Sequence, residues 1–141
     1  MELTFHTDYG LRTLMYAASH PDRKVTMREI ANAYSISLDH LRKVVHRLAQ
    51  NGYLVTTKGR GGGLTLGRSP ERIRIGEVVT VMEESMDIVD CQRQPCPLCG
   101  ACSLKEAFDS AKYAFVDRLN EFTLAGLLEN RRTSLAIRKL G

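Results

Sequence analysis

Three segments in the first half of the chain repeat apolar residues at the spacing of an amphipathic helix. They cover residues 8–19, a short stretch that starts at Thr26, and residues 37–50. In the third segment the apolar positions fall at i, i+3, i+4 and i+7, which predicts one face packed inward, made of Leu41, Val44, Val45 and Leu48. Thr26 followed by Glu29 predicts a capping box at the start of the second helix. A tight turn over residues 34–37 is predicted to join the second helix to the third.

The pattern changes after residue 52 to short runs typical of β-strands. Residues 53–57 and 64–66 are strand-like, and the loop between them, residues 58–63, contains four glycines. Such an arrangement predicts a β-hairpin with a sharply turned tip. A further apolar segment over residues 75–83 is typical of a helix.

A long helix is predicted in the second half of the chain. Ser103 followed by Glu106 suggests a capping box, and the helix should run toward Glu121. Its apolar stripe is longer than one small domain can cover, so we expect the same stripe of a second copy to pack on it. The alternative is that the helix packs on its own domain. The stripe consists of Leu104, Ala107, Phe108, Ala111, Phe115, Leu119 and Phe122.

Together these elements predict a mainly α fold: a winged helix-turn-helix domain with a small β-hairpin wing, followed by a long dimerisation helix. We divide the chain into a DNA-binding region (residues 1–74), a connecting helix with a cysteine-rich loop (75–102), the dimerisation helix (103–129) and a basic tail (130–141), expected to be partly disordered.

Charge is concentrated in the first of these regions. Residues 1–74 carry 12 Lys and Arg against 6 Asp and Glu, whereas residues 75–141 carry 8 against 10. A basic first half suits a polyanion such as DNA, although a solvated surface can carry the same excess. The apolar runs are far shorter than the ~20 residues that cross a bilayer, and the first twelve residues lack the core of a signal peptide. We therefore expect a cytoplasmic protein without a membrane span.

The outer face of the third helix is polar and basic, as in a recognition helix that enters the major groove. Arg42 and Lys43 are placed to reach base edges, and Arg47 is predicted to contact phosphate. The alternative is a core helix with a charged outer face. At the hairpin tip, the glycines allow close approach to the duplex, and no GK[ST] sequence follows them as in a nucleotide-binding loop. The candidate DNA-binding residues are Ser37, Asp39, His40, Arg42, Lys43, Arg47, Lys58 and Arg60.

All four cysteines fall within residues 91–102, CQRQPCPLCGAC. Because cytoplasmic thiols stay reduced, metal ligation is favoured over disulfides. The compact spacing resembles that of iron–sulfur ligands more than the paired CxxC units of structural zinc, and it leaves cluster, zinc site and redox thiol switch open. We find no constellation of nucleophile, base and pocket, so an enzyme is not expected.

These motifs resemble a known family. LTFHTDYGLR, the helix-turn-helix, the glycine-rich wing, RIRIGEVV and the cysteine loop before a long helix are similar to the iron–sulfur winged-helix regulators of bacteria, the IscR, NsrR and RirA kind. The opening TDYGLR and the cysteine spacing look most like the nitric-oxide-sensing members. The resemblance implies a homodimeric repressor with one cluster per subunit, [4Fe-4S] rather than [2Fe-2S], whose nitrosylation or loss releases a two-fold operator in double-stranded DNA.

The resemblance also implies a ligand set. The three family cysteines fall on Cys91, Cys96 and Cys102, and Asp8 of the partner subunit stands where the fourth ligand is expected. Cys99 departs from the family pattern and is an alternative fourth ligand. Lys58 stands where relatives usually carry Arg, so Arg60 is the candidate for minor-groove contact. The remaining alternatives are a sensor of iron or cluster supply and a zinc-stabilised structural or interaction module.

Overall fold

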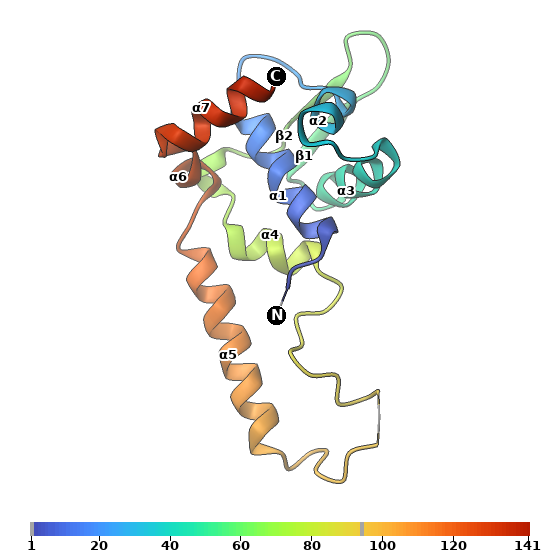
Figure 1. Cartoon of the computed structure of the whole chain (residues 1–141), viewed down its shortest axis with the longest axis vertical. Helices are drawn as coiled ribbons and strands as arrows, with labels where there is room; N and C mark the ends of the chain where they lie inside the picture. The colour runs from blue at the N-terminus through green and yellow to red at the C-terminus, as the bar shows by residue number, and fades with distance from the viewer. Residues whose placement is uncertain (1, 94) are drawn as a thin grey trace.

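The computed structural model describes residues 2–93 and 95–141 (Figure 1). Its described part is a helical head from which one long helix, α5, extends, and it contains one two-stranded sheet. The elements are α1 (Phe5–Ala18), α2 (Met27–Tyr34), α3 (Leu38–Gln50), β1 (Leu54–Thr57), β2 (Gly63–Leu66), the 3₁₀ turn η1 (Pro70–Arg72), α4 (Ile75–Met82), α5 (Ser103–Asn120), α6 (Leu124–Glu129) and α7 (Arg131–Leu140). None of the described helices is both long enough and apolar enough to span a bilayer.

The helix-turn-helix is formed by α2 and α3, as predicted. The Thr26 hydroxyl accepts a hydrogen bond from the Glu29 amide at 3.1 Å, and the Glu29 carboxylate accepts one from the Thr26 amide at 2.9 Å, which confirms the capping box. Ser35 ends α2 in the left-handed conformation, with φ of 54°. The Ser37 hydroxyl then caps α3 by accepting from the His40 amide. Local chemistry thus sets the angle between the two helices.

The hairpin is also confirmed, and it forms the wing. β1 and β2 pair antiparallel, with Leu54 opposite Leu66 and Thr57 opposite Gly63. Val25 adds a bridge to Leu64 through two backbone hydrogen bonds of 3.0 and 2.6 Å, which the sequence pattern did not indicate. The wing is therefore anchored to the segment that leads into α2.

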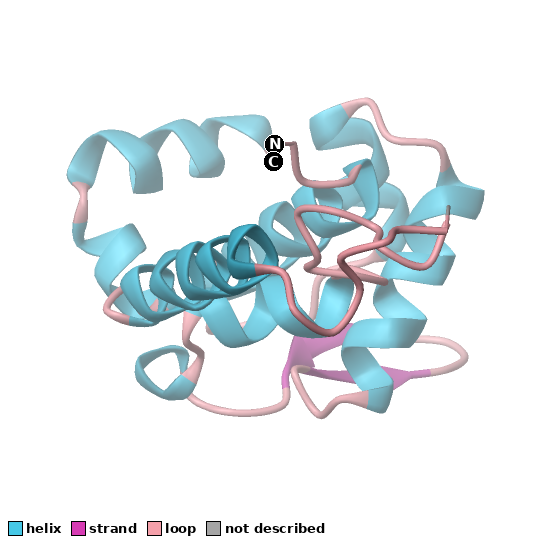
Figure 2. Ribbon diagram, turned by 90° about the horizontal axis from the view of Figure 1, so that it is seen from below, coloured by secondary structure: helices cyan, strands magenta, loops and turns pink. Residues whose placement is uncertain are grey.

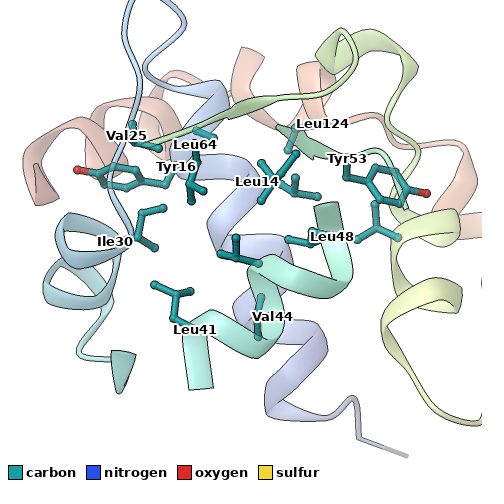
Figure 3. Packing of buried hydrophobic residues seen from close by; sticks show 14 of the residues in the cluster. Leu14, Tyr16, Val25, Ile30, Leu41, Val44, Leu48, Tyr53, Leu64 and Leu124 are labelled. Carbon is teal, nitrogen blue, oxygen red and sulfur yellow. The ribbon is translucent and has the colours of Figure 1, made fainter. Parts of the chain in front are cut away.

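The core lies between α1, α3 and the wing (Figure 3). The four residues predicted for the inner face of α3 are all buried. On α1 the prediction was less accurate: the helix begins at Phe5, and Leu11, Met15 and Ala18 are only half-buried, while Tyr16 is fully buried. The reason is that α1 is central, with α3, α4, β2, α6 and α7 all packed against it, so more than one face is covered.

The long helix α5 lies outside the head, and Figure 2 shows the loop that precedes it lying beside it. None of its residues is buried, although it packs against α4. This contact is close: a side chain at Gly76 would collide with Asn120, whose amide oxygen accepts a hydrogen bond from the Glu77 amide at 2.9 Å. Two predictions were wrong here. Cys102, not Ser103, is the N-cap residue, with no side-chain cap, and α5 ends at Asn120, so Phe122 lies outside it.

The tail is ordered, contrary to the prediction. The Asn130 carboxamide caps α7 by accepting from the Arg132 and Thr133 amides. Ile137 is buried in the core cluster, and α7 contacts α1 and α6. The basic composition of this segment hid a single apolar anchor, because Ile137 lies among exposed cations.

Candidate DNA interface and cysteine site

The exposed face of α3 presents the residues predicted to read DNA. His40, Arg42 and Lys43 are exposed, and the Asp39 side chain is 84% exposed. Arg42 forms an ion pair with Asp39 at 2.7 Å, one turn away on the same helix. Such exposed pairs contribute little stability, so Arg42 can exchange Asp39 for another acceptor at small cost.

The space between α3 and the wing is a basic hollow of about 510 Å³. Arg42 and His46 line it from α3, Lys58 lines it from the wing, and Arg28 lines it from α2. No carboxylate is among its described lining residues. Arg28 was missed by sequence reasoning, because the fold, not the helix pattern, brings it beside the other cations.

The tip of the wing depends on its glycines. Gly59 and Gly61 have φ values of 87° and 72°, which other residues adopt at a cost. A Cβ at Gly62 would lie 2.2 Å from the Thr57 carbonyl oxygen. Lys58 and Arg60 are both exposed at this tip. The tight turn therefore places two cations at the outermost point of the head.

Arg47 behaves differently from the other predicted contacts. Its Nε donates to the Val81 carbonyl at 2.8 Å, and an Nη donates to the Glu83 carbonyl at 3.4 Å. The guanidinium thus satisfies free carbonyls at the C-terminal end of α4 and ties α3 to it. The group predicted to contact phosphate is engaged within the chain.

The same point is tied to the start of α1. The Glu83 carboxylate accepts hydrogen bonds from the Thr4 amide at 2.8 Å and from the Thr4 hydroxyl at 3.0 Å. His6 lies in the field of these groups: partial burial, and then the charge of Arg47, lower the pKa of His6. Three segments therefore meet where the cysteine loop begins.

All four cysteines line one hollow of about 780 Å³ between the loop and the start of α5. None is in a disulfide; Cys96 and Cys99 are exposed, and Cys91 and Cys102 are half-buried. Lys105 and Glu106 line the same hollow. Thiolates are the correct donors for an iron–sulfur cluster or zinc. Within residues 2–93 and 95–141 of a single chain, however, no three Cys, His, Asp or Glu side chains converge as metal ligands, so the donor set fits but is open.

Asp8 is not among the residues that line this hollow in its own chain. Its carboxylate pairs with Arg12 one turn later, at 2.8 Å and 3.0 Å. A ligand role for Asp8 thus requires a second subunit and the release of Arg12.

Several residues that sequence reasoning missed hold the loop. The Asp90 carboxylate accepts from the amides of Gln92 and Arg93 at 3.0 and 3.1 Å, which forms a turn around Cys91. Lys112 of α5 bridges Asp87 at 2.8 Å and Asp109 at 3.3 Å, and its hydrogen bond lowers the pKa of Asp87. Spacing on α5 could have indicated the partner Asp109, but nothing in the sequence indicates the long-range contact to Asp87.

Comparison with known proteins places this architecture. The profile of the Rrf2 family, described as an iron-dependent transcriptional regulator, matches residues 3–130. The chain belongs to the Rrf2 family. Among its Rrf2 relatives are the HTH-type transcriptional regulator NsrR of Bacillus subtilis, 41% identical with 99% of each chain covered, and NsrR of Bacillus licheniformis, 39% identical with 93% of this chain and 94% of that one covered. The protein is thus a transcriptional regulator with a DNA-binding winged helix.

Solved structures agree on the fold. CymR, the global cysteine regulator of B. subtilis, superimposes with a TM-score of 0.73 at 22% identity, covering 92% of this chain and 97% of that one. T. potens IscR gives a TM-score of 0.75 at 22% identity, covering 93% and 88%. The Rrf2 winged helix with its projecting helix is therefore shared with proteins of quite different sequence.

Proposed function

We propose that this Rrf2 regulator is a cytoplasmic, homodimeric repressor, not an enzyme, whose iron–sulfur cluster senses nitric oxide and controls operator binding. The observation that carries the proposal is the gathering of four unbridged thiols in one hollow, on the loop between α4 and α5. The similarity to proteins named NsrR over nearly the whole chain supports it.

The DNA contacts follow from the exposed cations. We assign Arg42 and Lys43 to base edges in the major groove, with Ser37, Asp39 and His40 at the N-terminal end of the same helix. Lys58 and Arg60 at the wing tip lie against phosphates or in the minor groove. Arg47 acts at one remove, because its guanidinium positions α3 from behind.

Cys91, Cys96 and Cys102 are the proposed cluster ligands, with Asp8 of the partner subunit or Cys99 as the fourth. When bound, the cluster supplies iron that reacts with nitric oxide; [4Fe-4S] is favoured and [2Fe-2S] is the alternative. Cys102 caps α5, so its thiolate sits at the positive end of a helix dipole. The thiols, held by metal, fix the path of the whole loop.

The exposed apolar face of α5 supports the dimer. Leu104 is 61% exposed, and Ala107 and Ala111 follow it on the same face. Packing this stripe against its copy removes apolar surface from water and provides the two-fold symmetry of an operator. Pairing also lets Asp8 of one subunit reach a cysteine hollow that it does not reach in its own chain.

A path from the sensor to the reading helix is present in the described contacts. The cysteine loop begins at Glu83, whose carbonyl accepts from Arg47 of α3 and whose carboxylate accepts from Thr4 before α1. When the thiols release the metal, the loop loses its fixed path, and this junction transmits the change to α3.

The test is operator affinity with and without nitric oxide. Duplexes are first selected from a random pool by anaerobically purified protein, and their affinity is then measured during a nitric oxide titration. We expect affinity to fall as nitric oxide is added, and Cys91→Ala, Cys96→Ala and Cys102→Ala each to abolish cluster-dependent binding. The control is Leu98→Ala, which alters an exposed side chain of the same loop without removing a thiol. Unchanged binding in all three cysteine variants would refute the sensor.

The fourth ligand is tested by comparing Asp8→Ala with Cys99→Ala. Iron and sulfide per chain are measured after anaerobic purification of each variant. Loss of the cluster in Asp8→Ala alone assigns the partner's carboxylate, and loss in Cys99→Ala alone assigns the fourth thiol.

A sensor of iron or cluster supply is the second candidate, favoured by the iron-dependent description of the family. In that case iron chelation, and not nitric oxide, releases the selected duplex.

A further inference from the structure

The segment Cys96–Pro97–Leu98–Cys99 contains a thiol that the three-cysteine ligand set leaves over. Cys99 is exposed, as is Cys96, and both are free thiols. The backbone between them closes on itself, because the Cys99 amide donates to the Cys96 carbonyl at 3.1 Å. Two exposed thiols therefore lie at the two ends of a single turn.

This turn brings the two residues within disulfide range. A hydrogen bond from the fourth residue to the first is typical of a β-turn, in which the outer Cα atoms are less than about 7 Å apart. Disulfides join cysteines whose Cα atoms are about 4.4 to 6.8 Å apart. Pro97 occupies the second position, where its fixed φ favours the turn.

The other cysteines have no such arrangement in the described contacts. Cys91 is held in the separate turn that Asp90 organises, and Cys102 belongs to the start of α5. A second turn, closed by the Ala101 amide on the Leu98 carbonyl at 3.0 Å with Gly100 at φ of 87°, separates Cys102 from the first pair. The geometry thus favours one pair among the four.

We propose that Cys96 and Cys99 form an intramolecular disulfide in the cluster-free protein, which withholds Cys96 from cluster assembly until a thiol reductant restores it. The disulfide depends only on this turn, whereas its regulatory effect rests on the proposed cluster function. Loss of the cluster frees Cys96, and Cys99, which the three-cysteine ligand set does not include, is then its nearest partner along the chain.

The oxidant is a low-molecular-weight disulfide. The Cys99 thiolate attacks one sulfur of this disulfide, and the other sulfur leaves as a thiolate that takes up the proton lost by Cys99. The Cys96 thiolate then attacks the Cys99 sulfur of the mixed disulfide, and a second small thiol leaves. In balance, two protein thiols are oxidised to one disulfide, and one small disulfide is reduced to two thiols.

The test uses full-length protein stripped of metal, treated with oxidised glutathione and then alkylated. Trypsin cleaves after Arg93 and Lys105, so Cys96, Cys99 and Cys102 share one peptide and Cys91 lies in another. We expect this peptide to lose the mass of two hydrogen atoms, with alkylated Cys102 identified by fragmentation. Cys99→Ser should abolish the loss, and Cys91→Ser and Cys102→Ser should retain it as matched controls.

A second readout is reassembly with iron and sulfide. Oxidised wild-type protein should take up no cluster until dithiothreitol is added, whereas Cys99→Ser after the same treatment should take it up directly. An unchanged peptide mass, a link to Cys91, or loss of the product in Cys102→Ser overturns the disulfide proposal. If the disulfide forms but wild-type protein takes up no cluster even after reduction, the proposed cluster function fails and the disulfide stands.

Discussion

Glu29 joins three parts of the chain through its two carboxylate oxygens. One accepts from Arg23 at 2.7 Å and from the buried Tyr16 hydroxyl at 3.2 Å, and the other accepts from the Thr26 amide at 2.9 Å. Partial burial alone raises the pKa of Glu29, but these hydrogen bonds outweigh it and lower the pKa to about 2. A carboxylate of this kind stabilises the fold only in its charged form.

The pH dependence of stability follows. The ordinary pKa of 4.5 is lowered to about 2, so the stabilisation by Glu29 is complete above pH 4.5 and is lost as pH falls through about 2. We expect Glu29→Gln to lower the free energy of unfolding at pH 7 by about 2 kcal/mol, discounted for partial exposure, and to flatten its acid dependence. Urea unfolding followed by circular dichroism measures both. Glu129→Gln, at an exposed glutamate, is the control, and an equal effect there contradicts this role.

The single apolar residue Ile137 illustrates what residue patterns cannot indicate. The inner face of α3 was predictable because four apolar residues recur at helical spacing. One isoleucine among cations has no period, and its burial depends on where α6 places α7 against α1.

Two arginines on α3, five positions apart, have separate tasks. Arg42 is exposed and contacts only its neighbour Asp39, whereas Arg47 donates to carbonyls at the end of α4. Both appear equally basic and outward in the sequence. The difference arises from the packing of α4, which no local pattern specifies.

Substitutions should separate these tasks. We expect Arg42→Met to weaken operator binding with little change in stability, and Arg47→Met to lower the free energy of unfolding by about 1 to 3 kcal/mol through the lost charged hydrogen bonds. Chemical denaturation and binding to the selected duplex are measured for both. Equal stability of the two variants would show that Arg47 does not hold α4.

The wing offers a test that leaves every charge in place. Gly62→Ala puts a Cβ against the Thr57 carbonyl oxygen, so the tip must open. We expect DNA affinity to fall as far as in Arg60→Ala, while the free energy of unfolding changes by less than about 1 kcal/mol because the tip is exposed. Gly126→Ala, where only the Thr123 hydroxyl is near, is the control. Wild-type affinity in Gly62→Ala would mean that tip shape does not contribute.

In the whole molecule, α5 separates the reading head from the cysteine loop and carries the exposed stripe. The resemblance to known regulators, not the residue pattern alone, indicated that the loop and the helix form one device. The arrangement of the thiols remained beyond prediction, because it depends on backbone turns and on Asp87 and Lys112, which are far apart in sequence.

The dimer is tested on this helix. Leu104→Glu combined with Ala111→Glu places charges in the apolar stripe, and we expect analytical ultracentrifugation to show monomers, with lower affinity for a two-fold site. Ser110→Glu adds a charge to the same helix outside the stripe and should leave a dimer. A dimer in the stripe variant would place the subunit interface elsewhere.

The central claim is that the four thiols serve an iron–sulfur cluster. Its most direct test is the content of iron, acid-labile sulfide and zinc per chain after strictly anaerobic purification. We predict nearly equal iron and sulfide, with both lost in Cys91→Ala. Stoichiometric zinc without sulfide would contradict the account and make the cysteine loop a structural clasp of a DNA-binding protein.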